Sequence, residues 1–190
     1  MISCYLFLTL MFFISSWHDL NGMDNSFVDA KISIETNKPS YLEAILQSNP
    51  LDANRLKELL LAAAKANHSQ CFSCVLVKCS AEKLAVDNIF LELVNKHNAK
   101  LLKILLSDHG VQININGLHG EGKHHQTTPL IFLVKRYTQD SKAKACIKLL
   151  LNRPDIDLMV KDSDGKTFLD YADNKVRHIY LKVLGKKLHS

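Results

Sequence analysis

The sequence has few of the residues that interrupt helices. Only seven glycines and four prolines occur in 190 residues, of which 47% are hydrophobic. This scarcity excludes a collagen-like or low-complexity chain, and it disfavours the many turns of a sandwich or barrel. The runs between these residues are rich in leucine, which favours helices. We therefore expect one all-α domain with a modest core.

Cysteine is also scarce, and its pattern excludes a disulfide framework. The five cysteines, Cys4, Cys71, Cys74, Cys79 and Cys146, are odd in number and irregular in spacing. Cys71 and Cys74 have the spacing of a zinc or redox motif, but no second pair of ligands follows. They lie in an apolar run, CFSCVLV, and residues three positions apart lie on the same face of a helix. We expect these thiols to pack in the core.

Acidic residues are absent from the end of the chain. The stretch from Lys175 to Ser190 has no Asp or Glu, whereas the whole chain has a formal net charge of +5. Its basic residues are Lys175, Arg177, Lys182, Lys186 and Lys187. Such a segment suits an acidic partner, a membrane surface or nucleic acid. The plainer interpretation is the solvated face of a last helix.

No hydrophobic run has the length of a typical membrane-spanning helix. The run MISCYLFLTLMFFISS, residues 1–16, has the length of a signal-peptide apolar region. No Lys or Arg precedes it and no clear cleavage site follows, while Met23 opens a polar stretch that would serve as a start. Residues 1–22 are thus a signal peptide or anchor, or a mis-assigned start. The protein would be secreted or membrane-anchored in the first case and cytoplasmic in the second.

Two segments in the second half of the chain align with each other. Thr128–Leu133 (TPLIFL) and Thr167–Ala172 (TFLDYA) each open a short amphipathic helix with threonine at the capping position. Pro129 occupies the first helical position, which proline favours. The apolar stripe of Ala145–Leu151 predicts a second helix, and an extended loop then leads to Thr167. The chain therefore repeats a unit of short helix, second helix and loop.

This order resembles the ankyrin repeat, whose consensus centres on T-P-L-H-x-A in a 33-residue unit. The resemblance is best over Thr128–Ala172. Ile131 and Asp170 replace the consensus histidine, and Thr128 and Thr167 lie 39 positions apart. Weaker matches continue upstream, through His97–Leu106 and Leu60–Leu76 to a half-repeat at Pro39–Leu46.

The resemblance implies an all-α, ankyrin-repeat-like solenoid of helix-turn-helix units with extended finger loops. It would cover residues 38–188, after a polar leader at residues 23–37, with the basic segment Val176–Leu188 as its polar end cap. It also implies a non-catalytic adaptor that binds another protein as a monomer, or an exported effector, with no cofactor and no small-molecule substrate. Local catalytic signatures such as G-x-S-x-G and H-E-x-x-H are absent from the sequence.

The connection Gly117–His125 (GLHGEGKHH) comes close to a phosphate-binding loop. The P-loop pattern requires glycine, four residues, glycine, lysine and then serine or threonine. His124 stands where the hydroxyl should be. Four residues also separate Lys123 from Thr128, although the helix of a P-loop follows its lysine directly. We keep a nucleotide site as an alternative.

Histidines in the same loop open a second alternative. His119, His124 and His125, with Glu121 as an oxygen ligand, are residue types that bind metals. Adjacent residues point apart in an extended backbone, however, and no cysteine is near. A metal site therefore stays an alternative to a surface loop, as does electrostatic binding of a membrane or nucleic acid by the basic C-terminal segment.

In the ankyrin family, partners bind on the finger loops and on the face formed by the first helices. A loop adapts to a partner while the stacked helices hold it in place. Tyr and Arg are also frequent among energetically important interface residues. The candidate partner-binding residues are His119, Glu121, Lys123, His124, Gln126, Lys135, Arg136 and Tyr137.

Overall fold

The computed structural model describes residues 25–108, 110–120, 126–137 and 142–188. Ten α-helices make up most of these residues, which confirms the predicted all-α class. The helices are α2 (Asn25–Glu35), α3 (Pro39–Ser48), α4 (Ala53–Ala66), α5 (Ser69–Ala81), α6 (Asp87–Asn95), α7 (Ala99–Ser107), α8 (Pro129–Tyr137), α9 (Ala143–Leu151), α10 (Phe168–Tyr171) and α11 (Asn174–Leu188). In the described part of the chain, no helix has both the length and the apolar character that would let it span a membrane.

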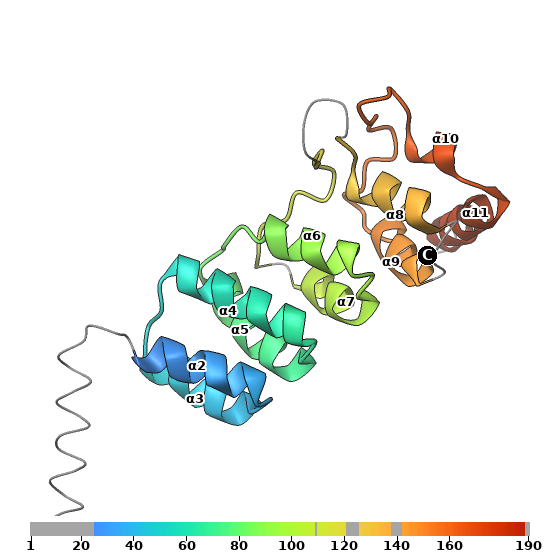
Figure 1. The fold of residues 1–190 in the computed structure, drawn as a ribbon. Helices are drawn as coiled ribbons and strands as arrows, with labels where there is room; N and C mark the ends of the chain where they lie inside the picture. Colours follow the sequence, from blue (N-terminus) through green and yellow to red (C-terminus); the bar gives the residue numbers. More distant parts are fainter. Residues whose placement is uncertain (1–24, 109, 121–125, 138–141, 189–190) are drawn as a thin grey trace, which may run out of the picture.

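The helices lie in two rows (Figure 1). Each of α2, α4, α6 and α8 packs on the helix that follows it in the chain, and also on the first helix of the next pair. Their partners α3, α5, α7 and α9 contact one another in the same order, and α10 and α11 extend the two rows. We call α2, α4, α6, α8 and α10 the first row and the others the second row.

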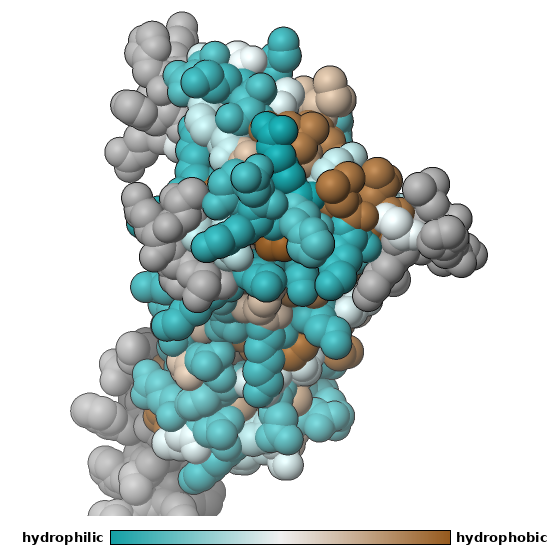
Figure 2. Space-filling model, turned by 90° about the vertical axis from the view of Figure 1, so that its right-hand side faces the viewer, coloured by the Kyte–Doolittle hydropathy of each residue, from teal (hydrophilic) through white to brown (hydrophobic). Residues whose placement is uncertain are grey.

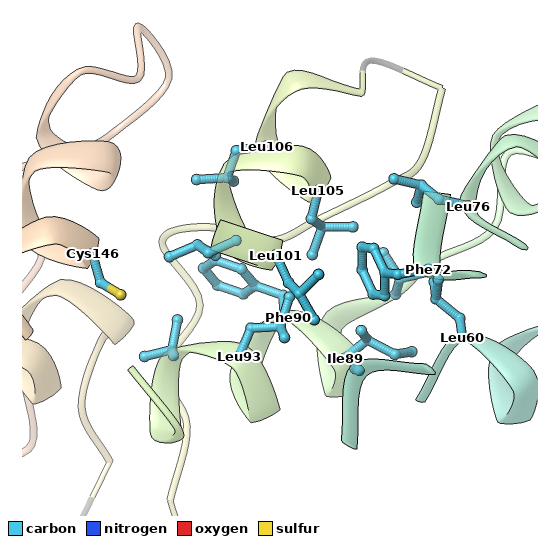
Figure 3. Close-up of a cluster of buried hydrophobic side chains, with 14 of the residues drawn as sticks. Leu60, Phe72, Leu76, Ile89, Phe90, Leu93, Leu101, Leu105, Leu106 and Cys146 are labelled. Atoms are coloured by element: carbon cyan, nitrogen blue, oxygen red, sulfur yellow. The ribbon is translucent and has the colours of Figure 1, made fainter. Parts of the chain in front are cut away.

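The core runs continuously between the two rows (Figure 3). Phe72 of α5 and Phe90 of α6 are fully buried and lie among leucines from neighbouring pairs. Cys146 of α9 is buried beside this cluster, as Cys71 and Cys79 are within it. Burial raises the pKa of the Cys79 and Cys146 thiols to about 11. Because the thiolate is the reactive form, these thiols act as small apolar groups. Of the two cysteines predicted to pack in the core, Cys71 is fully buried and Cys74 is half-buried.

The first three helix pairs repeat the same turn. The backbone N–H of Lys38 donates to the carbonyl of Ser33, that of His68 to Ala63, and that of Asn98 to Leu93. Corresponding donors are 30 positions apart. The residue before each donor, namely Asn37, Asn67 and His97, has a left-handed backbone with φ between 51° and 57°. This is the hydrogen-bond pattern that commonly ends helices, and here it turns the chain from one row to the other.

Helix α2 was not predicted from the sequence, and α6 was not predicted as a separate helix. The stretch 23–37, expected to be a polar leader, contains α2, whose Ala30 and Ile34 are buried against α3 and α4. Ser33 is also buried at the same face, where its hydroxyl donates to the carbonyl of Asp29. Val28 and Ile32 of the same helix are apolar but exposed, so apolar residues lie on both faces and the helical period is weak in the sequence.

The later connections are long and are held by polar side chains. Residues 108–128 join α7 to α8, and residues 152–167 join α9 to α10. The Asn116 amide donates to the carbonyl of Asp155 and accepts from the backbone N–H of Asp157, which ties the two connections together. Among the described residues, the only β-structure is a pair of isolated bridges, Ala85 with Gln112 and His119 with Thr127.

Candidate partner-binding surface

Neighbouring helices of the first row leave hollows between them. Those between α2 and α4, α4 and α6, and α6 and α8 have volumes of about 430, 400 and 320 Å³. Their walls are mostly apolar, with Leu61 shared by the first two. We call this surface of α2, α4, α6 and α8 the first-row face. A row of partly apolar hollows can accept side chains of a partner along its length.

The α6–α8 hollow lies at the base of the long connection 108–128. Leu91 and Val94 form one wall, and Phe132 of α8 forms another. Two elements of the sequence shape it: the apolar residues of α6 recur at helical spacing, and Thr128 caps α8 through its hydroxyl, which accepts from the N–H of Ile131 at 3.2 Å. The remaining lining residues are Asn95, His119, Gly120, Thr127, Thr128 and Pro129.

His119 and Thr127 close this hollow through a backbone bridge. Each N–H donates to the other residue's carbonyl at 2.9 Å. The His119 Nε2 atom and the Thr127 hydroxyl oxygen are both buried, and neither has a hydrogen-bond partner among the described residues. Buried polar atoms without partners are uncommon, and each costs about 1–3 kcal/mol. Both atoms are inaccessible to solvent, so the hollow presents the apolar Leu91, Val94 and Phe132 side chains rather than these two polar atoms.

A cation borders the same hollow. The Arg136 guanidinium lies 5.4 Å from the centre of the Phe132 ring, a favourable cation–π distance. Arg136 is exposed, and the structure pairs it with no carboxylate of the described residues. Tyr137, also predicted at this end of the helix, is half-buried and packs against the core.

Lys135 faces a different group. Its ammonium donates at 2.9 Å to Asp162, whose side chain is only 1% exposed. The Tyr171 hydroxyl and the N–H groups of Asp164 and Lys166 donate to the same carboxylate. Burial alone would raise the pKa of Asp162, but the hydrogen bonds from these four groups outweigh it and lower the pKa to about 2. Lys135 therefore joins α8 to the connection that precedes α10.

The structure brings only part of the predicted site together. His119 lines the α6–α8 hollow and Arg136 reaches it over Phe132, whereas Lys135 is turned to Asp162. Gln126 accepts a backbone hydrogen bond from Ser163 through its carbonyl. The predicted Glu121, Lys123 and His124, with His125 of the proposed metal site, lie outside the described residues.

The α6 side of the hollow was missed by sequence reasoning. Leu91, Val94 and Asn95 recur at helical spacing, which marks a helix face but does not distinguish core from binding surface. Leu91 is only partly buried and Asn95 is exposed, in contrast to Leu93 and Phe90. Only the packing of α8 and its preceding loop on α6 shows which of these residues belong to the core and which line the hollow.

The last helix presents a second surface. Val176, Ile179 and Val183 of α11 are buried, while Leu181 and Leu184 are exposed. Figure 2 looks onto the end of the molecule where α10 and α11 lie, and it shows a largely hydrophilic surface with several groups of hydrophobic atoms. Basic residues on α11 with exposed side chains include Lys175, Arg177 and Lys182.

Comparisons with known proteins leave the family open. No protein-family model matches the chain, and no curated protein matches it. Within the part of the chain that the structure describes, no three His, Cys, Asp or Glu side chains are grouped as metal ligands.

Proposed function

We propose that the protein is a non-catalytic protein–protein interaction module built from ankyrin-like helix pairs that stack as a solenoid. The observation that carries this proposal is the row of partly apolar hollows on the first-row face. Three further features support it: helix pairs stacked in two rows, the 30-residue recurrence of the turn, and the threonine caps at Thr128 and Thr167. The role is that of an adaptor or an exported effector.

A capture experiment with matched variants of the full chain tests this function. The face variant combines Asn88→Arg and Asn95→Arg, two exposed positions of α6 that line neighbouring hollows. The control combines Gln70→Arg and Val77→Arg, exposed positions of α5 with the same seven-residue spacing. Circular dichroism first establishes that all three baits are equally helical.

We expect the wild type and the control to retain the same partner from an extract of the source cells, and the face variant to lose it. On binding, the two added arginine charges would lose their hydration. A partner that fits the wild type offers them no counter-charge, so binding would weaken. Loss by the control and retention by the face variant would move the interface to the second row. Retention by all three baits would contradict binding on either surface.

A second candidate function, electrostatic binding through α11, is favoured by its exposed leucines beside exposed basic residues. Removal of α11 is a poor test, because the loss of buried Val176, Ile179 and Val183 would expose the core to solvent. Lys175→Gln with Lys182→Gln keeps the helix and removes two charges. Salt-sensitive binding to vesicles of anionic phospholipid that weakens in this variant would support the second candidate, and unchanged binding would reject it.

A further inference from the structure

The three hollows of the first-row face differ in how their charges are matched. Lys31 and Glu58 form an ion pair at the α2–α4 hollow. The α4–α6 hollow is lined by Glu58 and Asp87 as well as Lys57. Among the described residues, none of those that line the α6–α8 hollow is acidic, and Arg136 at its border pairs with no carboxylate. A negative charge on a partner is therefore complementary to this hollow alone.

The size and walls of the α6–α8 hollow restrict what can enter it. Its volume of about 320 Å³ is at the low end for ligand pockets, so it suits a side chain better than a cofactor. The Phe132 ring lines it and is only partly buried. A second aromatic ring packs well on such a wall in an offset or edge-to-face arrangement. An aromatic side chain thus fits both the volume and the wall.

We propose that the α6–α8 hollow is an anchor site for an aromatic side chain of a partner polypeptide, whose neighbouring acidic residue pairs with Arg136. This inference rests on the proposed function and gives the partner a chemistry: an aromatic residue adjacent to Asp or Glu in an accessible segment. Tyrosine suits the site, because its ring can pack on Phe132 while its hydroxyl stays hydrated.

The test uses three capped dipeptides and the full chain, observed by NMR. The first probe is N-acetyl-Asp-Tyr-amide. N-acetyl-Asn-Tyr-amide removes its charge, and N-acetyl-Asp-Ala-amide removes its ring. We expect the first probe, at concentrations up to about 10 mM, to shift the signals of Leu91, Val94 and His119. The alanine probe should leave these signals in place, and the asparagine probe should bind about threefold more weakly, as for an exposed ion pair.

Variants of the chain then locate the effect. Asn95→Phe fills the α6–α8 hollow from its exposed edge, while Asn88→Phe adds the same ring to the same helix in the α4–α6 hollow. Binding of the first probe should be lost in Asn95→Phe and kept in Asn88→Phe. In Arg136→Gln, N-acetyl-Asp-Tyr-amide and N-acetyl-Asn-Tyr-amide should bind equally. This loss of the difference is expected if the aspartate of the probe pairs with Arg136.

Three results would overturn the inference: no shift at the hollow, equal shifts with the alanine probe, or binding that survives Asn95→Phe. These results leave the proposed function standing if the capture experiment still shows loss of a partner from the Asn88→Arg, Asn95→Arg bait. If the capture experiment failed but the dipeptide still bound, the proposal of a protein partner would be rejected. The hollow would then be a site for a small molecule. The two ideas therefore fail separately.

Discussion

The first three helix pairs and the C-terminal part of the molecule are held by different interactions. In residues 25–107 the chain turns within each helix pair on backbone hydrogen bonds that recur every 30 residues. A left-handed Asn or His lies at each of these turns, and Lys83 after α5 is left-handed as well. Past residue 108, the described left-handed residues are Gly120 and Gly165, both in long connections. There the stabilising contacts come from side chains such as Asp162 and Asn116. Short turns need only backbone geometry, whereas long connections need specific polar side chains to order them.

The largest expected effect is in the core of the first region. Phe72 is fully buried, so Phe72→Ala would leave a cavity among the leucines of Figure 3. We expect the free energy of unfolding to fall by about 3–5 kcal/mol, measured by urea unfolding with circular dichroism. Phe168→Ala is the matched change in the second region, because Phe168 is equally buried but lies in the four-residue α10.

We expect a smaller loss for Phe168→Ala, because a terminal unit has neighbours on one side only. Its ring contacts Tyr180 edge-on, with ring centres 5.5 Å apart. An equal loss in the two variants would contradict the view that the last unit is held mainly by polar contacts.

An intermediate effect is expected at Asp162. Asp162→Asn keeps the shape of the side chain but removes the charge that Lys135 and the Tyr171 hydroxyl face. We expect a loss of about 2 kcal/mol in the free energy of unfolding at neutral pH, confined to the region around α8 and α10. Hydrogen exchange should show faster exchange at the N–H groups of Asp164 and Lys166 while α4 and α5 keep their protection.

The dependence on pH provides the check on this variant. The pKa of Asp162 is about 2 in the folded chain, below its ordinary value near 4 in an unfolded chain. The carboxylate therefore contributes stability that is present above about pH 5 and is lost as the pH falls towards 2. Wild type should lose this contribution over that range, and Asp162→Asn should lack it. Parallel pH profiles for the two proteins would show that the charge of Asp162 is not what stabilises the connection.

The smallest effect is expected at the recurring turn. Asn67 has φ of 57° and accepts a hydrogen bond from the Asn98 amide of the next pair at 2.9 Å. Asn67→Ala should cost about 1 kcal/mol, because alanine tolerates the left-handed region less well than asparagine. Asn67→Gly should cost less, since glycine adopts this backbone freely. Thermal unfolding measures both, and Asn37→Ala should behave like Asn67→Ala if the turn is a true repeat.

The helices could be predicted wherever the apolar period or a capping residue was strong. Thr128 and Pro129 located the start of α8, and Thr167 located that of α10, because capping depends on neighbours in sequence. The apolar stripe of α9 was equally clear. Helix α2 was missed, since its inward face includes Ser33 while apolar Val28 and Ile32 face solvent, and only the packing of α3 and α4 shows which face is inward. The 30-residue period was missed too. Buried Leu46, Leu76 and Leu106 recur at this spacing, but the left-handed turn residue changes from Asn67 to His97.

The candidate surface divides in the same way. The sequence by itself determined that the chain is helical, which residues cap α8 and α10, and that Cys71 is an apolar packing group, because these depend on local geometry and hydrophobicity. Tertiary structure decided that Lys135 is bound to Asp162 while Arg136 borders a hollow, although the two are adjacent in the chain. Successive helical residues point about 100° apart, so what each one meets depends on segments far away in sequence.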